Sequence, residues 1–413
     1  MSRWQGPDRP LLAVTALLVG FGLLMLYSAG QTDAPTNAAG AWIRQLVWVG
    51  AGIVAAWMAF RISPRLLEWS APGLYAFSLM LLLLTLLVGT GAGSAASSHS
   101  WLAIGGVRIG QPSELAKLAT ILLLARYLSS LREAPDNLRA LIVPCLIAGA
   151  PMLLVLAQPD LGSAIVFAGI LFAMLFWAGV RASLLLLLAS PAVSLLLAAD
   201  TRLWGAWMIL LAVLLVLWRE YVSEGVLIYL LNSAMGVFAI LLWNRLKPYQ
   251  QRRLSTFLNP EIDPAHSGYQ AIQSKVAVGS GGFLGNGFTA GPQKRLAFLP
   301  EQHTDFIFSV VGEELGFLGV FVALGLFFAL LAVLLRIARR ATDPFGSLVV
   351  FGIMGMLFSH VFENVGMTVN VMPITGIPLP FFSYGGSFLI ACALGVGLAL
   401  RVAWESRLAG YAD

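Results

Sequence analysis

The sequence predicts an all-α fold, a polytopic transmembrane helical bundle with about twelve spans. Of its 413 residues, 59% are hydrophobic and 11% are charged, whereas a soluble domain carries roughly 25% charged residues. Apolar runs long enough to cross a bilayer recur along the chain, and a span needs roughly 20 such residues. These runs lack the alternating polarity of a β-barrel, and in lipid a helix satisfies its own backbone groups. One long polar segment, residues 245–305, interrupts the pattern.

We expect residues 1–413 to form a single integral membrane domain without a cleaved signal peptide. The first apolar run is long enough to span and lacks a small-residue cleavage pattern. The predicted spans are residues 10–29, 42–60, 72–89, 114–130, 139–157, 161–178, 183–199, 203–219, 223–243, 306–335, 346–370 and 385–402. The polar segment 245–305 therefore lies between spans nine and ten.

Arginines in the short loops predict the orientation. They fall on the side of the N-terminus, which the positive-inside rule assigns to the cytoplasm. These residues are Arg61, Arg65, Arg132, Arg139, Arg181, Arg219, Arg336, Arg339 and Arg340. Both termini are then cytoplasmic, and loop 245–305 faces outward. The cations in this loop either escape the rule, which long loops do, or serve an anionic ligand. A net charge of +5 is too small to indicate nucleic acid.

A second outward loop, residues 90–113, changes character along its length. Its first part, 91–100, is small and polar, which is typical of a flexible segment. Alternating apolar residues around Gly105-Gly106 predict a short hairpin at the membrane surface. Ser113, with Pro112 just ahead of it, is the expected N-cap of the next helix.

The polar loop carries the first candidate for chemistry. Asp263 stands between prolines in the run PEIDP, which would present its carboxylate from a stiff segment. An ordinary Asp-Pro turn is the alternative. His266, Lys275, His303 and Asp305 share this loop, and such neighbours can tune a general base or bind phosphate.

The glycine-rich runs of the same loop are a separate feature. Gly279-Ser280-Gly281-Gly282 and Gly285-Asn286-Gly287 match no P-loop. We expect turns and close backbone approach there.

Ionisable residues also occur inside apolar runs. Glu114 and Lys117 are three apart and share a helix face, so an interfacial ion pair and a functional role both remain open. Asp160 is interpreted as a turn residue and N-cap of span six. We expect a further late set to face the bundle interior, either bracing helices or lining a path. This set is Glu313, Glu314, His360, Glu363 and Asn364.

Metal and cysteine patterns are weak. His303, Asp305 and Glu301 do not follow a structural-zinc spacing, so no protein-only metal site is expected. A divalent cation held jointly with a phosphorylated substrate is more plausible. Cys145 and Cys392 lie in apolar runs and are interpreted as small hydrophobes.

Several motifs together resemble the SEDS family (shape, elongation, division and sporulation), and its RodA branch more than its FtsW branch. The matching stretches are Trp101 with IGQPSELAK at 109–117; QPDLG at 158–162; PEIDP at 260–264 with GYQ at 268–270; IQSKVAVGSGG at 272–282; LPEQHTDFIF at 299–308; and PITGIPLPFFSYGGS at 373–387. The amino acids at residues 302–305 (QHTD) and 366–368 (GMT) favour the RodA branch. The stretches cover most of the chain, and their combination is highly specific.

The resemblance implies a peptidoglycan glycosyltransferase that polymerises lipid II during cell-wall elongation and rod-shape maintenance. Such an enzyme releases undecaprenyl pyrophosphate at the outer face of the bacterial cytoplasmic (inner) membrane, beside a class B penicillin-binding protein that supplies transpeptidation. The essential loop aspartate of the family falls on Asp263, as general base. Cations such as Lys117, Arg108, Lys275 and Arg252 would offset charge on the leaving pyrophosphate, with or without Mg²⁺ or Mn²⁺. The residues expected to contact substrate are Trp101, Arg108, Glu114, Lys117, Gln273, Ser274, Lys275, His303, Asp305 and Ser383.

One departure and two rivals accompany this interpretation. The family usually has ten spans, so residues 179–246 are expected to add a peripheral helix pair. A flippase for lipid-linked precursors would use interior charges to line a path, although the two halves show no convincing repeat. A non-catalytic scaffold for the penicillin-binding protein would need shaped outer loops but not Asp263.

Overall fold

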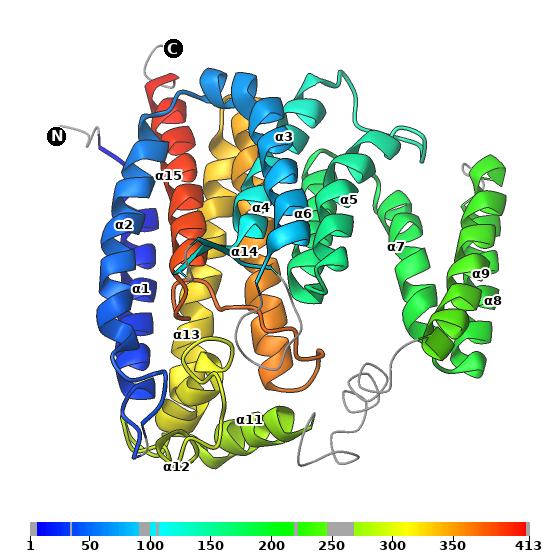
Figure 1. The fold of residues 1–413 in the computed structure, drawn as a ribbon. Helices are drawn as coiled ribbons and strands as arrows, with labels where there is room; N and C mark the ends of the chain where they lie inside the picture. The colour runs from blue at the N-terminus through cyan, green and yellow to red at the C-terminus, as the bar shows by residue number, and fades with distance from the viewer. Residues whose placement is uncertain are drawn as a thin grey trace.

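The structure is a computed structural model that describes residues 6–33, 35–90, 100–104, 107–218, 222–245 and 268–409. Helices dominate it (Figure 1). They are α1 (Arg9–Ala29), α2 (Ala41–Arg61), α3 (Pro64–Val88), α4 (Pro112–Ser130), α5 (Ile142–Ala157), α6 (Leu161–Trp177), α7 (Ala182–Leu197), α8 (Thr201–Leu217), α9 (Val222–Arg245), α11 (Tyr269–Ser280), α12 (Pro292–Arg295), α13 (Ile307–Arg340), α14 (Pro344–Thr368) and α15 (Gly386–Ala409). Each predicted span coincides with one of the long helices.

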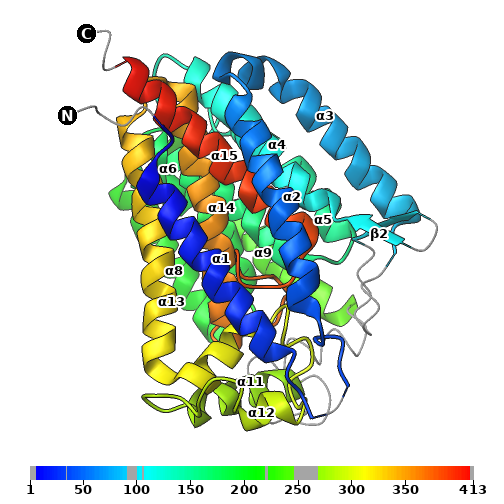
Figure 2. The ribbon, with the colours of Figure 1, turned by 90° about the vertical axis from the view of Figure 1, so that its left-hand side faces the viewer.

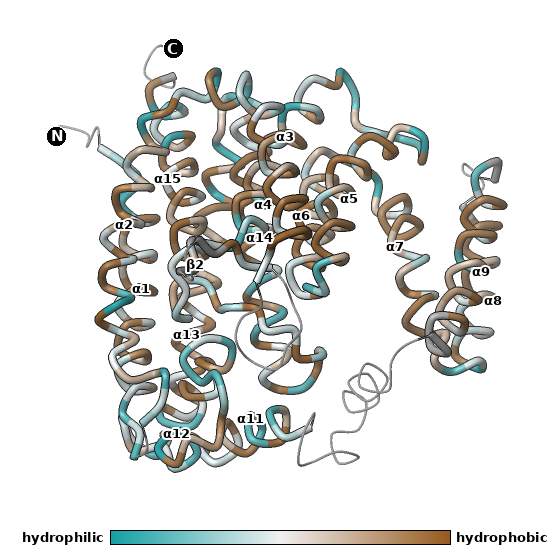
Figure 3. Tube along the Cα trace, in the orientation of Figure 1, coloured by the Kyte–Doolittle hydropathy of each residue, from teal (hydrophilic) through white to brown (hydrophobic). Residues whose placement is uncertain are grey.

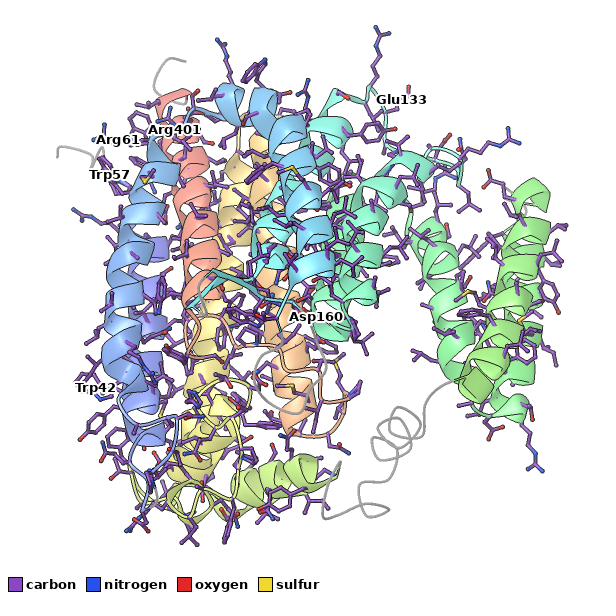
Figure 4. The ribbon with its side chains drawn as sticks, viewed as in Figure 1. Trp42, Trp57, Arg61, Glu133, Asp160 and Arg401 are labelled. Carbon is purple, nitrogen blue, oxygen red and sulfur yellow. The ribbon has the colours of Figure 1, made fainter. Side chains whose placement is uncertain are left out.

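The helices have the length and composition of a multi-pass membrane protein. Among the described residues, six helices are long and apolar enough to cross a bilayer, namely α1, α2, α3, α13, α14 and α15. α5 to α8 are apolar but have only 16 or 17 residues. Trp42 and Trp57 lie toward opposite ends of α2 (Figure 4), as expected of aromatic anchors at two membrane interfaces.

The third helix begins earlier than predicted. It starts at Pro64, not at residue 72, because the Ser63 side chain accepts a hydrogen bond from the backbone N–H of Leu66 and Pro64 occupies the first turn. Pro72 lies inside the helix and does not open it.

The loop before α4 confirms one prediction and corrects another. β1 (Leu102–Ile104) and β2 (Val107–Gly110) form the expected antiparallel hairpin. The N-cap assignment to Ser113 was wrong. Helix α4 begins at Pro112, two residues before the predicted start at 114, and Gln111 occupies the cap position. The Ser113 hydroxyl is buried without a hydrogen-bond partner among the described residues. Pro112 suits the first helical position, which explains the shift.

α14 is the central helix of the bundle. It packs against α4, α6, α13 and α15, while α2 pairs with α15 and α1 with α13. Close crossings depend on small residues: a Cβ on Gly397 of α15 would lie 2.3 Å from the carbonyl oxygen of Ala56 in α2. Residues carried by α14 are therefore enclosed by several other helices.

The two termini lie at one end of the bundle, and α11 and α12 form a layer at the other (Figures 1 and 2). Polar residues gather in that layer, while apolar residues dominate the helices above it (Figure 3). At the terminal end, the buried Asp8 carboxylate pairs with Arg336 at 2.7 Å and with Arg407. Arg61 and Arg401 lie at the same end (Figure 4). These four arginines therefore share one end of the bundle.

α7, α8 and α9 form a lateral unit (Figure 1) that contacts the main bundle through α6 and through the loop before α5, where the Leu138 N–H donates to Glu224 of α9 at 2.9 Å. A polar seam holds it together. The Asn232 side chain of α9 donates to Ser190 Oγ of α7 at 2.8 Å and accepts from Trp207 Nε1 of α8 at 3.3 Å. Ser194 Oγ donates to the Asn232 carbonyl at 3.0 Å and accepts from Trp204 Nε1. Such bonds join helices where lipid offers no competing partner.

α13 is longer than predicted and is broken near its start. The prediction ended it at residue 335, but it continues to Arg340, and Gly316 within it has φ +62°. The glycine-rich loop fills the break: Asn286 and Gly287 donate backbone N–H groups to the carbonyls of Glu313 and Glu314, both at 3.0 Å. We call residues 281–287 together with the break at Gly316 the clasp. It confirms the expected close backbone approach.

Candidate functional site

Lys117 is a deeply buried cation of the described bundle. It is fully buried, and its Nζ lies 2.8 Å from Glu114 Oε1 and 2.9 Å from His360 Nε2. The Phe388 ring stands 5.6 Å from the same ammonium, close enough for a cation–π contact. His360 Nδ1 lies 3.3 Å from the Pro378 carbonyl, so a proton on Nδ1 leaves Nε2 to accept from the lysine. We call Glu114, Lys117 and His360 the lysine cluster.

The hairpin and α4 place the first two members of this cluster. Glu114 and Lys117 occupy successive turns at the start of α4, directly after β2. Gln111, in the cap position, donates to Asp160 Oδ2 at 2.9 Å. Asp160 Oδ1 accepts from the Ser163 backbone N–H at 3.0 Å, which confirms its predicted N-cap role. Figure 4 shows Asp160 between the terminal end and the α11–α12 layer.

Next to the lysine cluster, α14 carries a buried carboxylate. Glu363 lies one helical turn from His360 and is 1% exposed. Neither of its oxygens has a well-formed hydrogen bond from the described residues, and the nearest polar neighbour is the Thr375 hydroxyl. Leaving such a group buried and unpaired costs free energy. A fold bears that cost most readily where a ligand or reaction needs the group.

Asn364 links α14 to the turn that contains Asp305. Its Nδ2 donates to the carbonyls of Asp305 at 2.9 Å and Ile377 at 2.7 Å. Two loops thus meet at one amide, because residues 299–306 lie on one side of it and residues 373–385 on the other. This connection joins α14, which carries His360, to the turn that contains Asp305.

His303, Asp305 and Ser383 come together where these two loops meet. Ser383 Oγ donates to the Thr304 carbonyl and accepts from the Leu379 N–H, and the Tyr384 N–H donates to the His303 carbonyl at 2.9 Å. Burial, with a smaller contribution from Glu301, raises the pKa of Asp305 to about 7. Burial also lowers the pKa of His303. Near neutral pH Asp305 can therefore gain or lose a proton, whereas burial favours the uncharged form of His303.

α11 carries three further predicted residues, and they differ in accessibility. Ser274 is buried, and its hydroxyl bonds Ser309 Oγ at 2.7 Å and the Thr368 carbonyl at 2.6 Å. It therefore fastens α11 to α13 and α14. Gln273 is half-buried, and Lys275 is exposed. Lys275 can reach an anionic ligand without any rearrangement of the helices.

The remaining predicted residues lie partly outside the described chain. Asp263, Arg252 and His266 are outside the described residues, and Arg108 is described only as part of strand β2. Trp101 is half-buried, and its backbone pairs with Thr90. No group of three His, Cys, Asp or Glu side chains that could hold a metal gathers in the described ranges. Those residues do not fit a protein-held divalent cation.

The site includes three residues that the prediction left out of its substrate-contacting set, His360, Glu363 and Asn364. All three stood out in the sequence as polar groups in an apolar run. The sequence could not pair His360 with Lys117, because 243 residues separate them. The signal that could have identified them was a polar or ionisable side chain inside an apolar run.

Comparisons with known proteins identify the family of this chain. The family model for FtsW, RodA and SpoVE, described as "Cell cycle protein", matches residues 9–203 and 188–408. The chain belongs to this family.

Named relatives cover nearly the whole chain. The peptidoglycan glycosyltransferase RodA of Treponema pallidum is 35% identical over 96% of this chain and 97% of its own. The peptidoglycan glycosyltransferase MrdB of Escherichia coli K12 is 36% identical, covering 95% and 92%. A probable FtsW of Trichlorobacter lovleyi is also 35% identical. RodA-named and FtsW-named relatives are equally similar, so the preference for the RodA branch stays a prediction.

Solved structures of the family share the fold. A chain from a structure of polymerization and crosslinking coordinated by a peptidoglycan synthase complex superposes with a TM-score of 0.73 at 30% identity, covering 98% of this chain and 99% of that one. The rod shape determining protein RodA of Thermus thermophilus gives a TM-score of 0.62 at 30% identity, covering 97% of each chain. Both TM-scores and both identities indicate the same fold as this chain.

Proposed function

We propose that this family member polymerises lipid II into glycan strands at the outer face of the bacterial inner membrane. Its activity as a peptidoglycan glycosyltransferase follows from the family and its named relatives. The observation that best supports a reaction within this chain is the lysine cluster beside the unpaired Glu363. A scaffold alone gains nothing from charges enclosed at this cost.

Asp263 is the proposed general base. It takes the proton from the acceptor sugar hydroxyl as that oxygen bonds to the anomeric carbon of the donor. The bond from this carbon to the pyrophosphate oxygen breaks, and the electron pair leaves with undecaprenyl pyrophosphate. Asp263 then holds the proton until solvent removes it. Asp263 precedes Tyr269, the first residue of α11, by six positions in the sequence, and α11 carries Lys275.

Cations compensate the charge that develops on the leaving group. Lys275 is exposed on α11 and can pair with a phosphate oxygen directly. Lys117 is enclosed by Glu114 and His360, so it acts indirectly, by holding His360 of α14, the helix whose Asn364 donates to the Asp305 carbonyl. Of the other predicted contacts, Ser274 and Ser383 hold backbone in place through committed hydroxyls.

The membrane arrangement completes the proposal. In this proposal twelve spans cross the membrane, both termini are cytoplasmic, and α11 and α12 face outward. The arginines that share the terminal end of the bundle support this orientation. The outward layer is then free to meet a class B penicillin-binding protein. The solved relative from a peptidoglycan synthase complex supports such a partnership. α7 to α9 contain the pair that exceeds the usual ten spans.

Purified full-length protein in lipid nanodiscs, supplied with fluorescent lipid II, tests this function. We expect glycan chains on a gel without any other polymerase, with higher yield when the penicillin-binding protein is added. The variant Ser233→Ala in the lateral unit α7–α9, whose hydroxyl bonds only its own helix, is the control and should polymerise at the parental rate. Polymer from neither preparation would contradict the proposal, and lipid II flipping in proteoliposomes without polymer would favour the transporter.

A further inference from the structure

The outward layer exposes large apolar side chains that no described helix covers. Phe283 is 64% exposed and Leu284 is 72% exposed, both at the tip of the clasp loop. In a water-facing loop such residues are costly, and exposed apolar patches commonly mark an interaction surface. The proposed reaction uses neither residue.

The break in α13 divides it into an enclosed part and an outward-facing part. Residues 307–314 are buried, whereas Phe317, Phe321 and Phe328 are strongly exposed. The exposed part is therefore the membrane-facing part, and it begins directly after Gly316. Figure 2 shows the direction of the helix changing near its lower end.

Helix geometry places Phe317 at the outer edge of the hydrocarbon. Arg336 at the cytoplasmic end of α13 pairs with Asp8. Arg336 lies 19 positions after Phe317, and at about 1.5 Å rise per position this segment spans about 29 Å. The hydrocarbon core of a bilayer is about 30 Å thick. With Arg336 at one boundary, Phe317 lies at the other.

The clasp holds the loop tip at this same level. The Phe317 N–H donates to the Gly282 carbonyl at 2.9 Å, and the Leu318 N–H donates to the Phe283 carbonyl at 3.2 Å. The rings of Phe283 and Phe317 stack at 5.7 Å, and those of Phe317 and Phe321 at 6.3 Å. The aromatic row on the loop is continuous with the lipid-facing side of α13.

We propose that Phe283 and Leu284 form an interfacial anchor that rests in the acyl chains of the outer leaflet. The occupant is lipid because the patch continues a lipid-facing helix surface and lies at the depth of the boundary. The anchor fixes the height of α11, and with it Lys275, above the bilayer. This inference rests on the proposed membrane orientation and is independent of the identity of the base.

Spin labels on the full chain in nanodiscs test the anchor. Cys145→Ala and Cys392→Ala remove the free cysteines, and Leu284→Cys, Phe328→Cys and Asn286→Cys are labelled one at a time. Phe328 is 74% exposed in mid-helix, and Asn286 is an exposed polar residue two positions from Leu284. Power saturation then compares collisions with oxygen, which prefers lipid, and with a nickel chelate, which prefers water.

We expect the ratio of oxygen to nickel accessibility at position 284 to resemble that at 328 and to exceed that at 286 by about threefold or more. A ratio at 284 equal to that at 286 would place the tip in water and overturn the proposal. Low accessibility to both reagents would show protein on the patch, either a second copy or a partner helix, and would also overturn it. The label reports depth without catalysis, so its outcome is separate from that of the polymerisation assay.

Discussion

At the scale of single residues, Lys117 is the side chain whose substitution should affect stability and activity most. Its ammonium is fully buried and is balanced by Glu114, while His360 supplies a second acceptor. A buried pair brings little net stability compared with apolar residues of the same shape, but removing one partner leaves an uncompensated charge. Stability and activity should therefore respond differently to single and double substitutions.

Lys117→Met should lower the free energy of unfolding by about 3–5 kcal/mol, because ionised Glu114 then stays buried without its partner. Adding Glu114→Gln should restore much of this stability, since both charges are gone. Polymerisation should fall in both variants. Thermal unfolding in detergent and lipid II turnover provide the two measurements, and a double variant with native turnover would remove Lys117 from the site.

Asp305 predicts a pH dependence with a definite sign. Burial raises its pKa to about 7 in the folded protein, whereas the unfolded value is about 3.9. The folded chain thus binds more protons between these values, so stability falls as pH rises from about 4 to about 7 and is flat above.

Asp305→Asn should remove this slope, because an amide cannot ionise. The variant should melt about 1–3 °C above the parent at pH 8, with a smaller difference at pH 5. Melting curves across this range measure it. Parallel pH profiles for variant and parent would show that Asp305 is ionised in the folded protein at low pH.

At the scale of elements, the break in α13 has a clear physical basis. Gly285 has φ +82°, and a Cβ there would lie 2.0 Å from the Glu314 carbonyl oxygen. Only glycine permits both the left-handed backbone and this approach. The sequence showed the glycines, but it did not show that a helix 30 residues away would break to receive them.

Gly285→Ala should destabilise the protein by about 2–4 kcal/mol, through backbone strain and the clash with Glu314. Gly279→Ala is the matched control: it lies in α11, nothing approaches its Cβ position within 4 Å, and alanine should stabilise a helix by about 0.5–1 kcal/mol. Chemical or thermal unfolding compares them. Equal stabilities would mean that the clasp does not form.

The lateral unit α7–α9 gives a second prediction at this scale. Asn232→Ala removes the amide that joins Ser190 and Trp207, and interhelical bonds in membranes are worth about 1 kcal/mol. Stability should fall by about that amount, and polymerisation should be unchanged because the unit lies apart from the lysine cluster. Ser233→Ala, whose exposed hydroxyl bonds only its own helix, should change neither property. Lost turnover in Asn232→Ala would instead connect the unit with the reaction.

At the scale of the whole molecule, the sequence predicted the helices well because lipid makes their apolar runs unambiguous. Its errors arose where local chemistry decides a boundary. Pro72 looked like a helix start but lies inside α3, and Ser113 looked like a cap but lies in the first turn of α4. Proline is compatible with either position, so its identity alone could not choose.

The candidate site was predictable in its members but not in its pairings. Glu114 and Lys117 are neighbours on one helix, so their ion pair could be foreseen as one alternative. His360, Asn364 and the junction of residues 299–306 with 373–385 depend on contacts between distant segments. Such contacts follow from how helices pack, which a single sequence does not encode in its periodicity.

The central claim is that Asp263 takes the proton from the acceptor sugar. Lipid II polymerisation by purified Asp263→Asn, compared with the parent and with Ser233→Ala at equal protein in nanodiscs, tests it most directly. A positioned base contributes about 10²–10⁴-fold to a rate, so we predict that Asp263→Asn loses at least about a hundredfold while the control keeps its rate. Polymerisation by Asp263→Asn at the parental rate would contradict the account.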